Sequence, residues 1–188
     1  MKTWMQSALV AFSLSTMALP VLAEPVQTKV AGNYHLTVYP DAFGEALDLE
    51  LFTKLADRQV FFGVGCSAMS PMPMLQVLMF DDDIVSETPK FMSASVQIDG
   101  GASIKLDAVL KPTLSADEIS NRMLLQFASQ RGDDMRVLKQ QYLDLLQALQ
   151  KGQNVKVTLS HRTIGEQAYD FSLAGMDELL RPYQNVCR

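Results

Sequence analysis

The 188-residue chain has little of what most catalytic and metal sites require. It contains two histidines, two cysteines and one tryptophan. His35 and His161 belong to no H-x-H or H-E-x-x-H pattern, and two lone histidines make a poor zinc site. A G-x-S-x-G turn, which presents a serine nucleophile in many hydrolases, is absent. The sequence therefore predicts no metal and no cofactor. It favours a protein that is not an enzyme, although a Ser-His-Asp triad, which is defined by geometry, stays open.

Basic residues are also few. Lysine and arginine together number 16 against 21 acids, which gives a formal net charge of −5 without a basic stripe. Nucleic-acid binding depends on neutralising phosphates, so we expect no nucleic-acid partner. A membrane-spanning helix needs about 20 apolar residues, and no segment reaches that length. We therefore expect another protein as the partner, and no stable membrane insertion.

The N-terminus has the pattern of a cleaved secretory signal. Lys2 supplies a positive charge, residues 8–19 are mainly apolar, and small or medium residues at 21–23 suit a cleavage site. We expect a signal peptide at residues 1–23 and a single globular domain at residues 24–188, a length that suits one domain. The predicted location is the periplasm, with full secretion as the second choice.

The two cysteines are Cys66 and Cys187. An even number of cysteines in an oxidising compartment favours one disulfide bond. The alternative is a catalytic Cys66 paired with His35 or His161, which would need a nearby cation or helix N-terminus to lower the thiol pKa. The apolar neighbours of Cys66 fit a buried strand end better, so we predict the bridge.

Alternating apolar and polar residues, and at 58–66 a nearly continuous apolar run typical of a central strand, predict strands in both halves of the chain. The candidates are residues 34–38, 47–51, 58–66, 74–80, 92–98, 104–110, 155–159 and 169–173. The sequence Asp99-Gly100-Gly101 between two alternating runs predicts a tight hairpin. Pro112 is expected to end the strand that follows this turn.

Helix signals are concentrated after residue 114. Ser115 and Glu118 have the spacing of a capping box, which predicts a helix starting there, while residues 122–128 fit helix or strand. A second helix is expected from Asp133 or Asp134 to Gly152, with an apolar stripe from Met135 to Leu149. A tail helix at 176–183 should kink or break near Arg181, because Pro182 lies within it. The resulting prediction is an α+β fold: an antiparallel sheet or sandwich with two to three helices packed on it, and one disulfide.

Four pieces of the chain, taken in order, resemble a known family. They are FGVGC at 62–66, SVQIDGG at 95–101, the leucine-rich helix at 143–151 with VKV at 155–157, and YDFSLAGM at 169–176 followed by Cys187. This order is similar to that of the secreted VasI-type proteins encoded with bacterial type VI secretion systems. Gly65 and Gln97 stand where that family has basic residues. The resemblance implies the fold, the disulfide, the compartment and a secretion-associated or partner-binding role, and it brings no catalytic residues.

Methionines follow Cys66 at positions 69, 72 and 74. Thioethers are soft ligands that select Cu(I), and Pro71 and Pro73 would hold this segment extended. Methionine is also a flexible filler of cores and adaptable surfaces. We favour the structural role. A periplasmic protein that binds copper or a small ligand through Met69–Met74 is the alternative.

Acidic side chains form two groups. Asp81, Asp82 and Asp83 are consecutive and lack the spacing of an EF-hand loop, and Glu45, Asp48 and Glu50 can form an acidic face. We interpret both groups as solvated charge. The predicted function is a non-enzymatic periplasmic interaction protein: an accessory factor, an inhibitor or an immunity-like binder. An enzyme acting on the cell wall ranks third. The predicted binding residues are Met69, Met72, Asp81, Asp82 and Asp83.

Overall fold

The computed structural model describes residues 26–70, 72–80, 90–114, 119–128, 134–162 and 165–187. The predicted signal peptide and the predicted binding residues Asp81, Asp82 and Asp83 lie outside these ranges.

In the described part of the chain, ten strands form one antiparallel sheet with the order β1-β2-β3-β4-β5-β8-β7-β6-β9-β10. The strands are β1 (Gln27–Ala31), β2 (Tyr34–Pro40), β3 (Ala46–Lys54), β4 (Val60–Ser67), β5 (Met74–Met79), β6 (Phe91–Ile98), β7 (Ile104–Leu114), β8 (Ile119–Gln126), β9 (Asn154–His161) and β10 (Gly165–Ser172).

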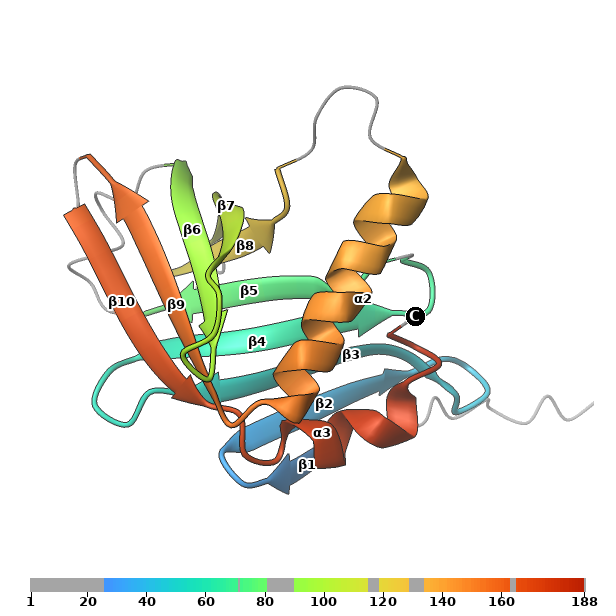
Figure 1. The fold of residues 1–188 in the computed structure, drawn as a ribbon. Helices are drawn as coiled ribbons and strands as arrows, with labels where there is room; N and C mark the ends of the chain where they lie inside the picture. Colours follow the sequence, from blue (N-terminus) through green and yellow to red (C-terminus); the bar gives the residue numbers. More distant parts are fainter. Residues whose placement is uncertain are drawn as a thin grey trace, which may run out of the picture.

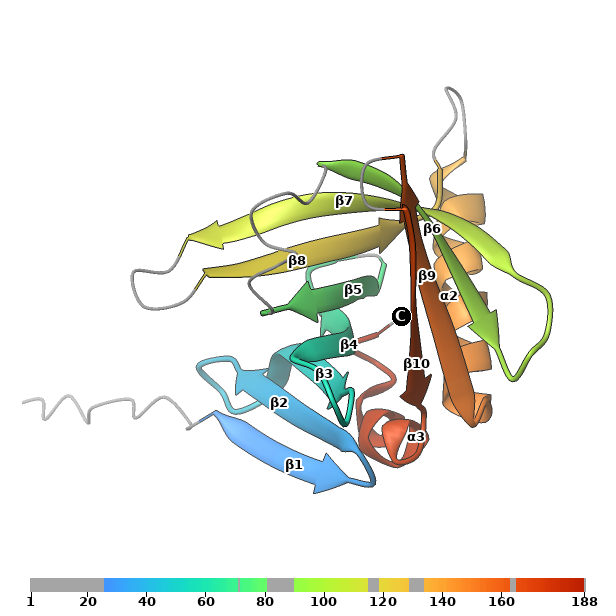
Figure 2. The same ribbon diagram turned by 90° about the vertical axis from the view of Figure 1, so that its left-hand side faces the viewer.

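Three runs of hydrogen-bonded neighbours build this sheet. Strands β1 to β5 follow one another, β6 to β8 form a second run, and β9 and β10 form a hairpin. The pairing of β5 with β8 joins the first two runs, and the pairing of β6 with β9 adds the third. The sheet is strongly curved, so that β10 comes round toward β3 (Figures 1 and 2).

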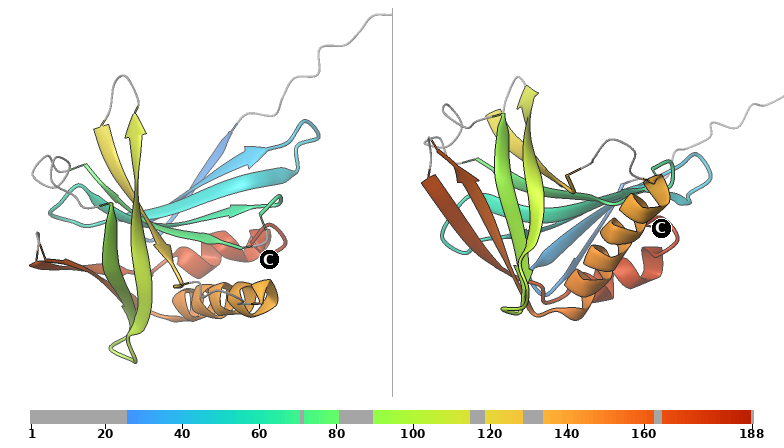
Figure 3. Two further views of the ribbon diagram at one scale, coloured as in Figure 1. Left: turned by 90° about the horizontal axis from the view of Figure 1, so that it is seen from above. Right: turned by 45° about the horizontal axis from the view of Figure 1, so that its top comes forward.

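Two α-helices and one short 3-10 helix complete the described fold: α2 (Met135–Lys151), α3 (Met176–Leu180) and η1 (Arg181–Tyr183). Helix α2 lies across the concave side of the sheet, and α3 lies beside β1, where the two ends of the sheet approach each other (Figures 2 and 3). A hydrogen bond also joins the tail to β1: Lys29 Nζ donates to the Tyr183 hydroxyl at 2.6 Å. The predicted break near Arg181 is confirmed, since the α-helix changes to a 3-10 helix at that residue.

The concave face of the sheet carries the core. Tyr34, Leu36 and Val38 of β2 are buried while His35 is exposed, as period-two alternation predicts. The same alternation recurs in β3, β6 and β9, and the buried residues of the sheet form one apolar cluster with α2, α3 and the tail. Burial of this cluster is the main stabilising contribution to the fold.

The predicted boundaries of α2 are confirmed at both ends. The Asp134 carboxylate caps the helix and accepts a hydrogen bond of 2.9 Å from the Arg136 N–H. Gly152 ends the helix in an extended conformation, and a Cβ there would lie 2.5 Å from Ile98 Cγ2, so the glycine allows close packing. The first residue of the predicted stripe is wrong, because the Met135 side chain is exposed. The buried residues of α2 are Tyr142, Leu145, Leu146 and Leu149.

The predicted hairpin turn is confirmed. Asp99 and Gly100 have φ values of 50° and 72°, and the Gly101 N–H donates a hydrogen bond of 2.8 Å to the Ile98 carbonyl. The Asp99 carboxylate also accepts hydrogen bonds from the backbone N–H groups of Gln153 and Asn154. The turn thus secures the point where the chain passes from α2 into β9.

The predicted α+β class is wrong. One large sheet dominates the fold, and the described helices have 17, 5 and 3 residues. The capping-box prediction contributed to this error. Residues 115–118 lie outside the described ranges, but Leu114 and Ile119 are paired across β7 and β8, so strand pairing overrides the local helix signal. Pro112 also lies within β7 and does not end it. The predicted disulfide and the single β-rich domain are confirmed.

Candidate functional site beside the disulfide

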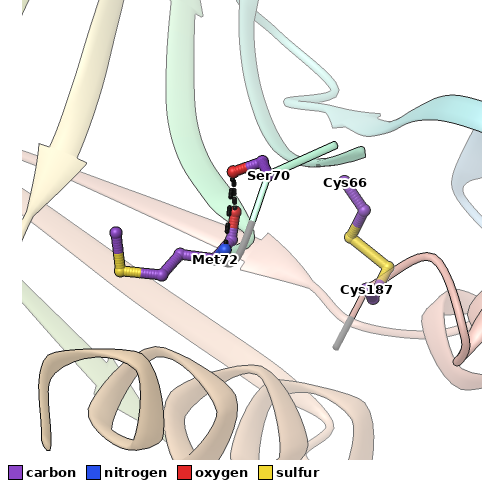
Figure 4. The surroundings of a disulfide bond; sticks show 4 residues. All are labelled: Cys66, Ser70, Met72 and Cys187. Atoms are coloured by element: carbon purple, nitrogen blue, oxygen red, sulfur yellow. Dashed lines mark hydrogen bonds between the residues drawn. A yellow bond between two sulfur atoms is a disulfide. The ribbon is translucent and has the colours of Figure 1, made fainter. Parts of the chain in front are cut away.

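The disulfide joins Cys66, at the end of β4, to Cys187 in the tail, with the two Cα atoms 4.9 Å apart (Figure 4). Both cysteines are buried. The bridge attaches the C-terminal tail to a central strand of the sheet. Because Cys66 is bonded, it has no thiolate to offer as a nucleophile or a metal ligand, and the catalytic-thiol alternative is wrong.

Serine hydroxyl groups and the neighbouring strand hold the loop between β4 and β5. The Met69 N–H donates to Ser67 Oγ, and Ser70 Oγ donates a hydrogen bond of 2.9 Å to the Met72 carbonyl (Figure 4). The Ala68 N–H donates a hydrogen bond of 2.8 Å to the Leu47 carbonyl at the start of β3. The described part of this loop is therefore attached to the scaffold at several points.

The three spaced methionines occupy different environments. The Met69 side chain is 84% exposed, Met72 is half-buried against the core cluster, and Met74 is 37% exposed on the convex face of β5. Met72 and Met74 line one hollow, whereas Met69 lies at the surface of the loop. Of the predicted binding residues, Met69 and Met72 therefore share the loop but face different surroundings.

The hollow has a volume of about 490 Å³ and lies at the loop end of β3, β4 and β5. We call it the methionine hollow; its lining residues are Tyr39, Asp48, Leu49, Glu50, Gly65, Cys66, Ser67, Ser70, Met72 and Met74. It thus combines two thioethers and a phenol with two carboxylates. The acidic face that the sequence suggested at Asp48 and Glu50 belongs to this hollow.

An ion pair crosses the convex face of the sheet beside the hollow. Arg122 Nη1 of β8 lies 3.3 Å from Glu50 Oε1 of β3, and both side chains are 29% exposed. Because β4 and β5 separate β3 from β8 in the sheet, the two side chains reach toward each other over these strands. Burial and then the Glu50 carboxylate raise the pKa of Tyr39, while Arg122 opposes them. The Tyr39 hydroxyl is therefore a neutral hydrogen-bond donor at physiological pH.

A buried amide lies beneath this ion pair. The Gln76 side chain is fully buried on the convex face of β5, and among the described residues neither its Nε2 nor its Oε1 has a hydrogen-bond partner. Gln76 is paired with Gly63 of β4 and Leu124 of β8. Its Nε2 lies 3.8 Å from the position that a Cβ would occupy at Gly65, which lines the hollow. Sequence reasoning missed Gln76, although a single amide within the apolar run M-L-Q-V-L-M was a usable signal.

The histidines do not join the methionine hollow. His35 is exposed on β2, and His161 lines a separate hollow of about 730 Å³ with Phe91, Met92 and Phe127. Among the residues that the structure describes, no three His, Cys, Asp or Glu side chains are placed to hold a metal ion. No helix in the described ranges is both long and apolar enough to cross a membrane.

The fold and the site define a disulfide-closed, sheet-dominated domain with an acidic and apolar hollow beside its bridge. No family model and no curated protein sequence matches the chain. Among solved structures, it is similar to invasion associated protein B from Bartonella henselae, with a TM-score of 0.46 and 15% sequence identity over 83% of this chain and 94% of that one. This likeness is distant, and none of the comparisons points to type VI secretion.

Proposed function

We propose that this protein binds another protein and catalyses no reaction. The observation that carries the proposal is a group of exposed apolar side chains at one end of the sheet. Phe43 is 91% exposed, Met69 84%, Tyr39 39% and Met74 37%. We call these four residues the apolar corner. Exposed apolar residues that gather in one place are typical of interaction sites.

The strand register explains why these residues share one end of the sheet. Tyr39 is paired with Asp48, Asp48 with Ser67, and Gly65 with Met74. The loop after β2 and the loop after β4 therefore leave the sheet at the same end (Figure 1). The apolar corner adjoins the methionine hollow, because Tyr39 and Met74 belong to both.

The loop that presents Phe43 is held in place before any partner arrives. The Asp41 carboxylate accepts hydrogen bonds from the backbone N–H groups of Phe43 and Glu45, and the Asp41 N–H donates to the Glu45 carbonyl. A loop that is already ordered loses less conformational entropy on binding. Methionine side chains at the same corner can adapt to the shape of a partner.

Acidic groups surround the apolar corner. Asp41 and Glu45 lie in the loop with Phe43, and Asp48 and Glu50 line the hollow. This arrangement suits a partner whose surface combines apolar and basic side chains. Opposite charges across an interface accelerate association and make it salt-dependent. The acids Asp81, Asp82 and Asp83, which lie outside the described residues, remain part of the proposed binding surface.

The proposed setting is the periplasm, with secretion as the second choice. The signal-like N-terminus and the disulfide bond support an oxidising compartment outside the cytoplasm. The motif order shared with VasI-type proteins supports a secretion-associated accessory, inhibitor or immunity-like role within that setting.

The test compares two exposed phenylalanines on different parts of the sheet. The exported protein and its Phe43→Ser/Met69→Ser and Phe91→Ser variants are used to capture partners from periplasmic extract. The predominant partner is then purified for affinity measurement. Phe91 is 69% exposed at the start of β6, so it is a matched control. We expect at least a tenfold loss of affinity in the double variant, none in Phe91→Ser, and weaker binding as salt increases. The absence of any specific partner, or an equal loss in Phe91→Ser, contradicts the proposal.

Copper binding through Met69, Met72 and Met74 is the alternative function, and it can be tested on the same protein. Titration with Cu(I) against a competing chelator should show no tight stoichiometric complex, because the Met69 side chain lies outside the hollow lined by Met72 and Met74. A tight complex that is lost when all three methionines are replaced would favour the copper alternative.

A further inference from the structure

The Gln76 amide is an unusual group to bury. It is fully inaccessible, and neither its donor nor its acceptor has a partner among the described residues. An unpaired buried amide reduces the stability of the fold, because the amide gives up hydrogen bonds to water and gains none in return. Leu78 and Leu124, which flank it on the same face, are the kind of residue that this position would otherwise accommodate. Stability therefore does not explain the amide, whereas a role in binding would.

The Gln76 amide and the Met74 methyl group both lie close to Gly65, which lines the methionine hollow. The Met74 Cε lies 3.1 Å from the position of a Cβ at Gly65, and Gln76 Nε2 lies 3.8 Å from the same position. Gly65 carries no side chain and lines the hollow together with Met74. The Met74 side chain is unbranched and partly exposed, so it can rotate without movement of the strand.

The charge of the hollow selects a cation. Asp48 and Glu50 supply two carboxylates, and Arg122 binds one oxygen of Glu50, Oε1. Glu50 Oε2 and both oxygens of Asp48 have no partner among the described residues. One negative charge therefore remains uncompensated beside an amide oxygen that can accept a hydrogen bond.

We propose that the methionine hollow binds the guanidinium group of an arginine side chain from the partner protein. Asp48 and Glu50 accept its N–H groups, and Tyr39 and Met72 contact its planar face. Gln76 Nε2 lies nearer to Gly65 than Oε1 does, so the amide turns to present Oε1 as a further acceptor once Met74 moves aside. Arginine suits this site better than lysine because its planar guanidinium is weakly hydrated, presents several donors and stacks on aromatic rings. This inference rests on the proposed function, since it names the chemistry by which the partner is recognised.

The experiment uses the exported protein, labelled with ¹⁵N and with ¹³C at the methionine methyl groups. The probes are the blocked peptides acetyl-Leu-Arg-Leu-amide, acetyl-Leu-Lys-Leu-amide and the citrulline analogue of the first, which keeps the shape of arginine without its charge. We expect the arginine peptide to shift the Gln76 side-chain amide and the Met74 methyl resonances in a saturable way. The lysine and citrulline peptides should bind at least about tenfold more weakly, the effect of losing a charge-assisted hydrogen bond.

Two variants of the proposed site and one control variant test whether the arginine peptide binds there. Asp48→Asn and Gln76→Leu should each weaken binding of the arginine peptide by about tenfold or more, because each removes an acceptor. Asp107→Asn removes the same charge from an exposed position on β7 and should leave the affinity unchanged. Folding of each variant is checked from the dispersion of its amide spectrum.

Failure of this inference is distinguishable from failure of the proposed function. Equal binding of the citrulline or lysine peptide, or an arginine peptide that leaves the Gln76 amide resonances unmoved, overturns the arginine site even if a partner protein is captured through Phe43 and Met69. Site-specific binding of the arginine peptide supports the site even if no partner is recovered from the periplasmic extract.

Discussion

Strands β4 and β5 present two faces with very different chemistry. On the concave face, Val60, Phe62 and Val64 of β4 are fully buried in the apolar core. On the convex face of the same strands lie Gly63 and the unpaired amide of Gln76, with an ion pair from the neighbouring strands above them. Successive residues of a strand point to opposite faces, so the two faces share one backbone and differ only in their side chains.

The residues of the concave face are explained by the stability of the fold. Gln76 on the convex face is explained better by a role in binding. Every buried group on the concave face of these two strands is apolar, which is what stability alone would select. The convex face keeps a buried polar group at a cost in stability, and natural proteins break packing rules most often at functional sites. Truncation of a core side chain should therefore lower stability, whereas replacement of the buried amide by an apolar side chain should raise it.

The largest expected effect is on the concave face. Phe62 is fully buried, and its ring centroid lies 5.6 Å from that of Phe171 across the curved sheet. Phe62→Ala should lower the free energy of unfolding by about 3–5 kcal/mol, because it removes an aromatic ring and leaves a cavity. Urea denaturation followed by circular dichroism measures this change.

Phe61, the preceding residue, provides the matched control. It faces the opposite way, is only half-buried, and contacts Phe80 at a ring-centroid distance of 5.4 Å. Phe61→Ala should cost clearly less than Phe62→Ala. Equal costs for the two variants would mean that the concave face is not the main source of stability.

The disulfide should have the next largest effect. Cys66 and Cys187 are 121 positions apart in the sequence, so the bridge restricts a long stretch of the unfolded chain. The Cys66→Ala/Cys187→Ala variant should lose about 2–4 kcal/mol of unfolding free energy. Hydrogen exchange should show the loss of protection first in α3 and η1, which the bridge fastens to β4. Unchanged stability and unchanged exchange in the tail would contradict this structural role.

Much of the sheet could be predicted from alternation, because most strands bury one face only. Strands β2, β3, β6, β9 and β10 follow this pattern, and the Asp99-Gly100 turn has the expected positive φ values. Strands β4 and β5 are buried on both faces and were predicted from their apolar runs instead. Strand β1 was missed, since four of its five residues are exposed at the edge of the sheet and give no alternation. Strand β8 was left open between helix and strand at residues 122–128, because M-L-L-Q at 123–126 has two neighbouring leucines that are both buried, one on each face of the sheet.

The candidate site was predicted only in part, and the reason is topological. The loop with Met69 and Met72, the bridge between Cys66 and Cys187, and the acids of β3 were all visible as separate features of the sequence. Their meeting place depends on which strands become neighbours. Arg122 reaches Glu50 because β8 pairs with β5, a contact between residues 72 positions apart that no local pattern encodes.

The third prediction concerns the convex face, where the sign of the effect reverses. Gln76→Leu should raise the free energy of unfolding by about 1–3 kcal/mol, since it replaces an unsatisfied buried amide with an apolar side chain of similar size. The midpoint of urea denaturation measures this gain. Gln76→Glu, which would bury a charge, is the opposing control and should be strongly destabilising. A loss of stability in Gln76→Leu would show that the amide has hydrogen-bond partners after all.

The smallest effect on stability is expected at the ion pair above this amide. Glu50→Gln removes the charge that faces Arg122 at 3.3 Å, and because both side chains are partly exposed, the loss should not exceed about 1 kcal/mol. A double-mutant cycle with Arg122→Gln isolates the pair, and its coupling energy should fall as salt increases.

The Glu50→Gln variant should also change the pKa of Tyr39 in a definite direction. The Glu50 carboxylate disfavours the negative phenolate of Tyr39 and so raises the pKa of that residue. Without this charge, burial still raises the pKa but Arg122 opposes it alone, so Tyr39 in Glu50→Gln should ionise at a lower pH than in the parent protein. Absorbance titration, with Tyr39→Phe as the reference that removes this one signal, measures the change. A Tyr39 pKa that stays constant or increases would mean that Glu50 does not reach the hollow electrostatically, and the two faces would then differ in packing but not in charge.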